Sequence, residues 1–467
     1  MANSIIEQQP LYEQLPVGQE IIYVVSNDDA VANQTKVKFI AEVHISSGNP
    51  PVLSSADDVI GTFKTTPNNA GVGIFDFRNI VENYVKADNM AANGSAYKTA
   101  TTSADLPHAL HLIDKFSLNN HVVSYLRIQF KVEYLNTTTN IVETAAGTAV
   151  NSELNSIFNG YLKYTDVLNL GSSPNASDFG YNLAIFNLSG STNRFLTNAS
   201  TTQYANTEDY GTLSMLTPDN NLAKINLTYY DSTGSSLGTE TVNKNALTGA
   251  YDTWGVEANR QMLHFGCFPA NLQNWSSTFQ GLVTAGTIEG GSIKVQAASD
   301  LGLSISQAYT INVNCPNLKD FEPIRLTWLN QWGAWDYYTF TKKSIRTTST
   351  KGTTYTQLAG TWNESKYRVD SYKGGKKDFR RNATEKIKMN TGFVTEDEAV
   401  VFEELINSPE VYLLDGYQVD LNNALNQYVT PVRLTTSSFT RKTKANDRLM
   451  QYTFEIEKSK TLRTQSV

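Results

Sequence analysis

Residues 324–340 read Ile324-Arg-Leu-Thr-Trp-Leu-Asn-Gln-Trp-Gly-Ala-Trp-Asp-Tyr-Tyr-Thr-Phe340 and hold three of the six tryptophans in the chain. Residues of alternating character lie on both sides of a central turn at 329–334, which predicts two strands. Gly333 suits the turn because it adopts conformations that bulkier residues resist. Aromatic side chains bury the most area per residue, so this hairpin is expected to form a core or a subunit interface. The interface candidates are Trp328, Trp332, Trp335 and Tyr337.

Two other segments accompany this aromatic stretch, at Pro67–Tyr84 and Arg194–Asn198. Together the three segments resemble motifs in a group of virion structural proteins of tailed bacteriophages. The resemblance implies a component of the tail tip, baseplate or neck that folds in the host cytoplasm and is then part of the virion. It also implies a symmetric homo-oligomer that docks to other virion tail proteins. None of the three motifs is catalytic.

The fold class is predicted from length and composition. A chain of 467 residues is expected to form about three domains, since domains commonly hold about 150 residues. Charged residues make up only 18%, whereas Thr, Asn, Ser and Tyr are abundant, which favours half-exposed strands. We therefore expect a mainly β protein with an α+β portion. The predicted domains are a β-rich domain with one short helix at 1–148, a β-sandwich at 149–316, and a hub-like α+β domain with the aromatic hairpin at 317–467.

Local patterns predict the elements of these domains. Alternating residues predict strands at 36–45, with His44 on the solvated face, and at 122–135. Helical spacing predicts a short helix at 77–85 with Asp76 as its N-cap. In the middle domain, strands are expected at 224–230, 236–242, 280–285, 291–297 and 308–314. In the last domain, the capping box of Thr395 and Glu398 predicts a helix at 395–407.

Several function classes lack their sequence signatures. The two cysteines have no metal-binding spacing, the N-terminus does not resemble a signal peptide, and no apolar run is long enough for a membrane span. His108, His111 and His121 are concentrated but have no acidic ligand at a metalloenzyme spacing. Catalytic motifs with a nucleophile elbow, a phosphate loop or a zinc helix are absent from the sequence. We therefore predict no enzyme activity, no cofactor and no metal.

Charge is divided unequally along the chain. Residues 1–315 hold 15 Lys and Arg against 27 Asp and Glu, whereas residues 316–467 hold 23 against 18. Basic residues interleaved with aromatics lie at 362–389, where Lys376, Lys377, Arg380 and Arg381 are interface candidates. Such a segment can bind nucleic acid or an acidic protein surface. The interrupting acids and the net charge of −7 favour the acidic protein surface.

The sequence also allows a second function, which is glycan binding. The middle β-sandwich could present loops that bind a host-surface glycan, as in an adhesin or receptor-binding protein. Trp254 and Trp275 are then the candidate platforms on which sugar rings stack.

Overall fold

We describe the fold from a computed structural model of the chain. The structure describes residues 3–463 with gaps at 48–49, 54–57, 88, 91–108, 119–120, 164–179, 217–221, 244–261, 315–320, 364, 397, 417–428, 439, 441–449 and 461. Strands hold 49% and helices 12% of the residues that the structure describes, which confirms the predicted β-rich fold class with some α+β character.

The chain forms two compact units. Unit 1 comprises Met1–Pro316, Leu329–Asp336 and Gly416–Asn426, and unit 2 comprises Asn317–Trp328, Tyr337–Asp415 and Gln427–Val467. The predicted boundary at 316 coincides with the end of the first segment of unit 1. The predicted boundary at 148 falls inside a sheet, because β10 (Val150–Asn151) and β11 (Asn155–Phe158) both pair with β8 (Val123–Asn136).

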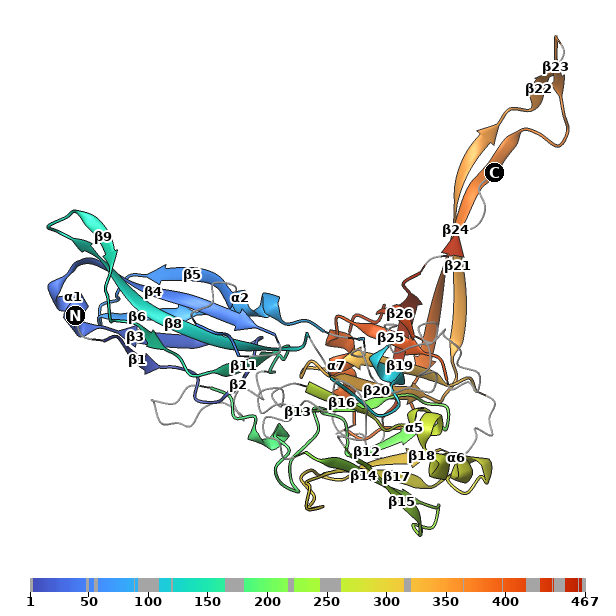
Figure 1. Ribbon diagram of the computed structural model, residues 1–467. Coiled ribbons are helices and arrows are strands. Elements are labelled where there is room, and N and C mark those ends of the chain that lie inside the picture. The colour runs from blue at the N-terminus through green and yellow to red at the C-terminus, as the bar shows by residue number, and fades with distance from the viewer. Residues whose placement is uncertain are drawn as a thin grey trace. The chain divides into compact units, whose positions relative to one another are not determined.

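The first part of unit 1 is a pair of sheets with a core between them (Figure 1). One sheet has the order β1-β3-β6, formed by Ile5–Gln8, Ile22–Ser26 and Val72–Asp76. The other has the order β2-β11-β8-β4-β5, in which β2 is Gln14–Pro16, β4 is Thr35–Ser46 and β5 is Val59–Thr65; β9 (Ile141–Thr144) and β10 also pair with β8.

The core joins the two sheets through aromatic contacts. The ring centroid of Phe130 on β8 lies 5.7 Å from that of Tyr23 on β3 and 5.7 Å from that of Phe75 on β6. Short helices flank these strands: α1 (Asp28–Asn33), α2 (Arg78–Val81) and the 3-10 turn η2 (Glu82–Tyr84). Alternate residues of β3 and β6 therefore point into this core, and the residues between them point out of it.

The rest of unit 1 contains two further sheets. One has the order β12-β18-β17-β14-β15, formed by Thr202–Ala205, Tyr309–Val313, Ser292–Ala298, Lys224–Tyr230 and Ser236–Asn243. The other has the order β13-β16-β7, formed by Thr212–Leu216, Met262–Gly266 and Phe116–Leu118. The helices here are α5 (Pro269–Trp275), α6 (Ser277–Thr284), η3 (Leu110–Leu112) and η4 (Ala184–Phe186).

Unit 2 is built on one sheet with the order β20-β19-β25-β26-β27-β24-β21. These strands are Trp335–Phe340, Ile324–Leu329, Val411–Leu414, Val429–Leu434, Thr453–Lys458, Gly375–Asn390 and Ile345–Gln357, with β28 (Leu462–Arg463) also paired to β24. Helix α7 (Val400–Asn407) packs on this sheet through Phe402, whose ring lies 4.9 Å from Tyr338 and 5.3 Å from Phe454. A further hairpin, β22 (Gly360–Asn363) with β23 (Lys366–Val369), lies between β21 and β24 in the chain.

Three local predictions need correction. Residues 280–285 lie largely in helix α6 and not in a strand, because Ser276 caps the helix by accepting a hydrogen bond from the backbone N–H of Phe279. His44 is buried, with 0% exposure, and does not lie on a solvated face. The helix expected at 77–85 is divided into α2 and η2, and its N-cap position is Phe77.

Candidate protein-interaction site

The four aromatic residues predicted to lie at a subunit interface are buried within the chain itself. They are Trp328, Trp332, Trp335 and Tyr337. In unit 1, the Trp332 ring lies 4.5 Å from Phe186 and its Nε1 donates to Asn198, while Trp335 meets His111 edge-on at 4.9 Å. The interface interpretation of these residues is therefore corrected: the hairpin forms core, and none of the four offers an exposed ring to a neighbour.

Gly333 explains why the turn of this hairpin fits its surroundings. Its φ is +71°, and a Cβ at this position would lie 2.4 Å from the carbonyl oxygen of Asn159. Asn330 closes the turn, because its Oδ1 accepts hydrogen bonds from the backbone N–H groups of Trp332 and Ala334. Only glycine suits both the backbone conformation and the close approach.

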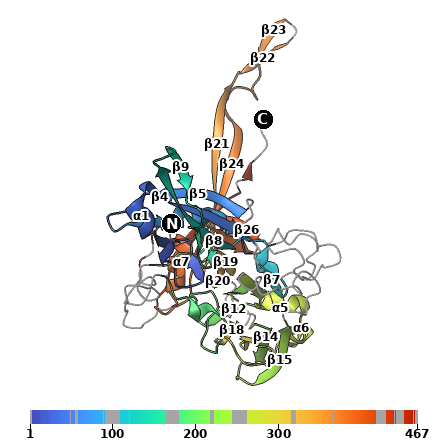
Figure 2. The same ribbon diagram turned by 60° about the vertical axis from the view of Figure 1, so that its left-hand side comes forward.

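The four basic candidates lie on β24, in a part of unit 2 that projects from the sheet (Figures 1 and 2). Strands β21 and β24 pair from Ile345 and Lys388 outward to Gln357 and Gly375. On the sheet side, β24 also pairs with β27 at 386–390 and with β28 at 382–383, but residues beyond Asn382 pair with β21 alone. We call residues 351–381 the arm.

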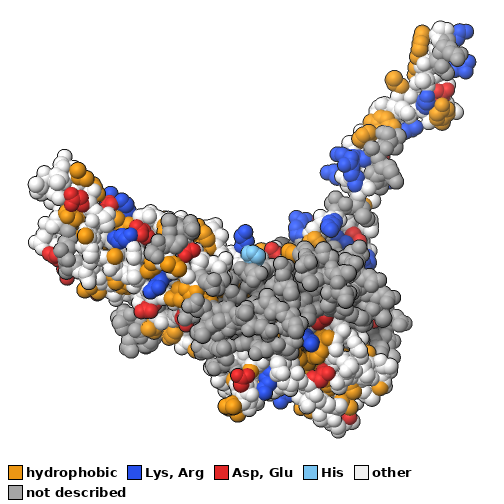
Figure 3. All heavy atoms as spheres, viewed as in Figure 1, with side chains coloured by type: hydrophobic (Ala, Val, Ile, Leu, Met, Phe, Trp, Pro, Cys, Tyr) orange, Lys and Arg blue, Asp and Glu red, His pale blue; other side chains and the backbone are white. Residues whose placement is uncertain are grey.

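The arm is basic and is exposed on both faces. It holds eight Lys and Arg against three Asp and Glu. Three of the basic candidates are exposed, namely Lys376, Lys377 and Arg381, and Arg380 is half-buried. On the paired strand β21, all but two residues are exposed. Figure 3 shows Lys and Arg side chains along the arm. A strand pair that buries neither face leaves the side chains of both faces open to solvent.

The outer part of the arm also exposes large apolar side chains. Trp362 is 70% exposed and Tyr372 is 72% exposed. Trp362 lies opposite Tyr367 in the β22–β23 pair. The exposed apolar residues of the arm are Leu358, Trp362, Tyr367, Val369, Tyr372 and Phe379. Aromatic residues and arginine are enriched in protein interfaces, where tryptophan, tyrosine and arginine supply most of the binding energy.

Ion pairs hold the sheet end of the arm. Arg346 on β21 pairs with Glu322 and with Glu385 on β24, and Glu385 also pairs with Lys458 on β27. The hydrogen bond from Lys458 is the main cause that lowers the pKa of Glu385, and the hydrogen bond to Glu322 is the main cause that raises the pKa of Arg346. The arm is therefore fixed at its base while its outer part lacks support from a third strand.

The candidate platforms for sugar stacking do not form a site in the described residues. Trp254 lies outside them. Trp275 is half-buried at the end of α5, and the Lys115 ammonium lies 4.9 Å from the centroid of its ring. This cation covers a ring face that a sugar would need.

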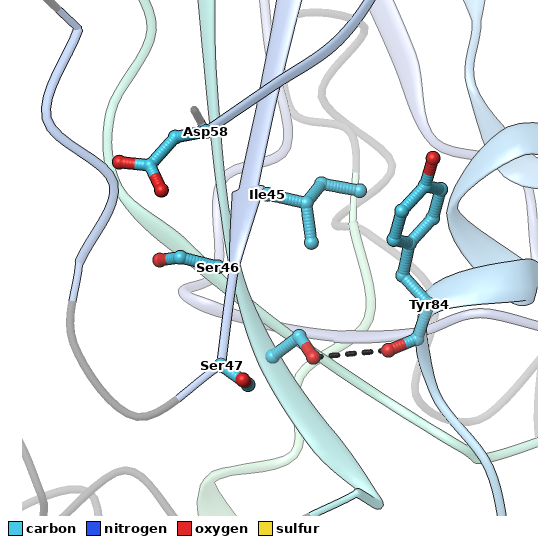
Figure 4. A pocket seen from close by; sticks show the side chains of 6 residues that line it. Ile45, Ser46, Ser47, Asp58 and Tyr84 are labelled. Atoms are coloured by element: carbon cyan, nitrogen blue, oxygen red, sulfur yellow. Dashed lines mark hydrogen bonds between the residues drawn. The ribbon is translucent and has the colours of Figure 1, made fainter. Parts of the chain in front are cut away.

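A cavity of about 370 Å³ lies at the end of β4 and is lined by Ile45, Ser46, Ser47, Asp58, Tyr84 and Ser124. Figure 4 shows Ile45 pointing toward Tyr84, whereas Asp58 lies on the other side of β4. Ser124 donates its hydroxyl hydrogen to the carbonyl oxygen of Tyr84 at 3.0 Å. The carboxylate and the aromatic ring therefore do not converge on one ligand position.

Buried polar groups in unit 1 include a serine–histidine pair that the sequence did not reveal. Ser214 Oγ and His264 Nδ1 lie 2.7 Å apart on paired strands β13 and β16. Both residues are buried, so this pair is closed to solvent. Within the described ranges, no group of three or more His, Cys, Asp and Glu is placed to hold a metal ion, and His108 lies outside those ranges.

Comparison with known proteins adds no relative. No protein-family model matches the chain, and no curated protein matches its sequence. None of the helices in the described part of the chain has the length and apolar character of a membrane-spanning helix.

Proposed function

We propose that this chain is a structural component of a tailed-phage virion, in the tail tip, baseplate or neck, which assembles by docking its arm onto a neighbouring protein. The observation that carries the docking role is the arm itself, a basic strand pair that exposes both faces and several aromatic side chains. The virion assignment rests on the three sequence segments that resemble phage structural proteins.

Energetics favour a docked arm over a free one. Two strands without a third strand or a covering helix are only marginally stable in water. Exposed aromatic and aliphatic side chains gain about 25 cal/mol for each Å² of apolar surface that a partner removes from water. Docking therefore stabilises the arm and buries the surface that the isolated chain leaves in solvent.

A variant without the arm tests the docking role. Residues 352–381 are replaced by Asn-Gly, which forms a two-residue hairpin turn between Lys351 and Asn382, a directly opposed pair. Wild-type and armless chains are compared by light scattering and negative-stain electron microscopy. We expect oligomers from the wild type and a folded monomer from the armless chain, whereas oligomers of equal size from both chains contradict the role.

The virion assignment has a separate test. An antibody raised against the purified chain should label the tail region of phage particles in electron micrographs. Labelling of the host cell surface without labelling of particles would contradict it.

A further inference from the structure

A second surface of the chain matches the arm in apolar character and is opposite to it in charge. It is the outer face of the β1-β3-β6 sheet, on the side away from the core. Tyr23 and Val25 of β3 point into the core, so Ile22 and Val24 point outward. Ile22 lies opposite Asp76 and Val24 lies opposite Ile74 in the register of β3 and β6.

Apolar side chains on this outer face are open to solvent. Ile74 is 53% exposed and Ile5 on β1 is 58% exposed. Ile22, Val24 and Val72 are half-buried. Apolar residues thus lie on all three paired strands of this face, with the polar Ser26 directly opposite Ile5, and we call it the acceptor face.

Carboxylates border the acceptor face. Glu7 on β1 and Asp76 at the end of β6 are exposed, and Glu20 is exposed just before β3 begins. Arg78 is the neighbouring cation, and it pairs with Glu20 at 3.3 Å. The local balance is therefore acidic, as is the wider segment 1–315, where 27 acids face 15 basic residues.

The arm and the acceptor face are complementary in charge and in apolar character. The arm combines exposed aromatic residues with an excess of basic side chains, and the acceptor face combines exposed isoleucines with an excess of acidic ones. Opposite charges around apolar centres speed association and select the correct partner. We propose that the arm of one copy of this chain docks on the acceptor face of a second copy.

This contact is heterologous, because one copy contributes its arm and the next contributes its sheet. Each copy then has one free arm and one free acceptor face, and repeated contacts close a ring or continue as a filament. The inference rests on the proposed function and adds the partner to it: the neighbour is another copy of the same chain.

Complementation between two defective variants tests the contact. The arm variant carries Trp362→Ala and Tyr372→Ala, and the acceptor variant carries Ile74→Lys; all three side chains are exposed, so both variants are expected to fold. Each variant alone should be monomeric in sedimentation velocity. Mixed together, the intact arm of one and the intact face of the other should form a 1:1 dimer that cannot grow further.

Ile141→Lys is the matched control, because Ile141 is 61% exposed on β9 and lies outside both surfaces. This variant should assemble like the wild type. Circular dichroism of all variants checks that each has the wild-type fold.

The outcomes separate the inference from the proposed function. If the arm variant loses assembly while Ile74→Lys assembles normally, the acceptor face is overturned and the docking role of the arm survives. A wild-type chain that stays monomeric at every concentration also overturns the second copy as partner. If the arm variant assembles like the wild type, both the inference and the docking role fail.

Discussion

Asp336 follows the turn of the aromatic hairpin and is buried in unit 1. Burial raises the pKa of its carboxyl from 3.8 to about 6, although hydrogen bonds from Thr197 and Asn330 partly oppose the shift. The folded state thus holds this proton more strongly than the unfolded chain does. Its stabilising contribution is complete below pH 3.8 and is lost as the pH rises through about 6.

Asp336→Asn should therefore stabilise unit 1 at pH 7.5, by about 1–3 kcal/mol from a shift of roughly two pKa units. The amide keeps an oxygen that can accept the hydrogen bond from Thr197. Urea unfolding at pH 7.5 and pH 4.5 measures the effect, and the gain should shrink at the lower pH. An equal gain at both pH values would show that the carboxyl titration is not its cause.

Asp231→Asn is the control, and its expected effect on stability is opposite to that of Asp336→Asn. Asp231 is half-buried in the turn between β14 and β15, and its pKa is lowered by hydrogen bonds from the Thr233 hydroxyl and the Ser235 backbone N–H. Its stabilising contribution is present above pH 3.8 and is lost as the pH falls through the lowered pKa. The asparagine variant should lose stability at pH 7.5.

Alanine substitutions at Trp335 and Trp362 distinguish effects on stability from effects on association. Trp335 is 2% exposed, so Trp335→Ala leaves a cavity and should cost about 3–5 kcal/mol of unfolding free energy. Trp362→Ala removes an exposed ring and should change the unfolding free energy by less than about 0.5 kcal/mol. In thermal unfolding and light scattering, the first variant should lose stability and the second should lose assembly. Loss of assembly from both without a change in melting temperature would contradict the core role of Trp335.

At the scale of elements, the arm is expected to be the least protected part of unit 2. Its outer strands have exposed backbone hydrogen bonds and no covering layer, features of segments that open locally. In hydrogen–deuterium exchange of the monomer, amides of 352–380 should exchange at least about 100-fold faster than those of the β4–β8 pair. In the oligomer they should gain protection. Full protection in the monomer would mean that the arm already has a partner within its own chain.

Sequence patterns predicted the helices and strands whose side chains are buried on one face and exposed on the other. Thr395 and Glu398 make the predicted reciprocal hydrogen bonds, but helix α7 begins only at Val400, with Ala399 at its N-cap position and no side-chain cap. Strand β8 and the β14–β15 hairpin also follow their alternating patterns. Helix α6 was missed because its short apolar run has no length or period that distinguishes it from a strand.

The arm was not predicted as a strand pair, for a related reason. A strand that buries neither face needs no alternation of apolar and polar residues, so β21 with its many threonines carries no readable period. The basic residues of the arm were visible in the sequence, but the strand pair that carries them was not. The acceptor face was invisible as well, since Ile5, Val24 and Ile74 come from three separate segments that only the sheet brings together.

At the scale of the whole molecule, the division of charge should control how copies associate. The arm carries eight basic residues against three acids, and residues 1–315 carry 27 acids against 15 basic residues. We expect such a chain to attract copies of itself through these oppositely charged surfaces, whereas its net charge of −7 opposes random contact. In the proposed contact, charge directs association, and the exposed aromatic residues of the arm supply the apolar surface that stabilises it.

Salt should weaken this association. Screening shortens the reach of charge from about 10 Å at 0.1 M salt to about 3 Å at 1 M. We expect the association constant to fall on the order of tenfold between 0.05 and 0.5 M NaCl, measured by sedimentation equilibrium. The double variant Lys376→Glu and Lys377→Glu should associate more weakly at low salt and respond less to added salt. Association that strengthens with salt would instead indicate a contact dominated by apolar burial, in which these lysines have no directing role.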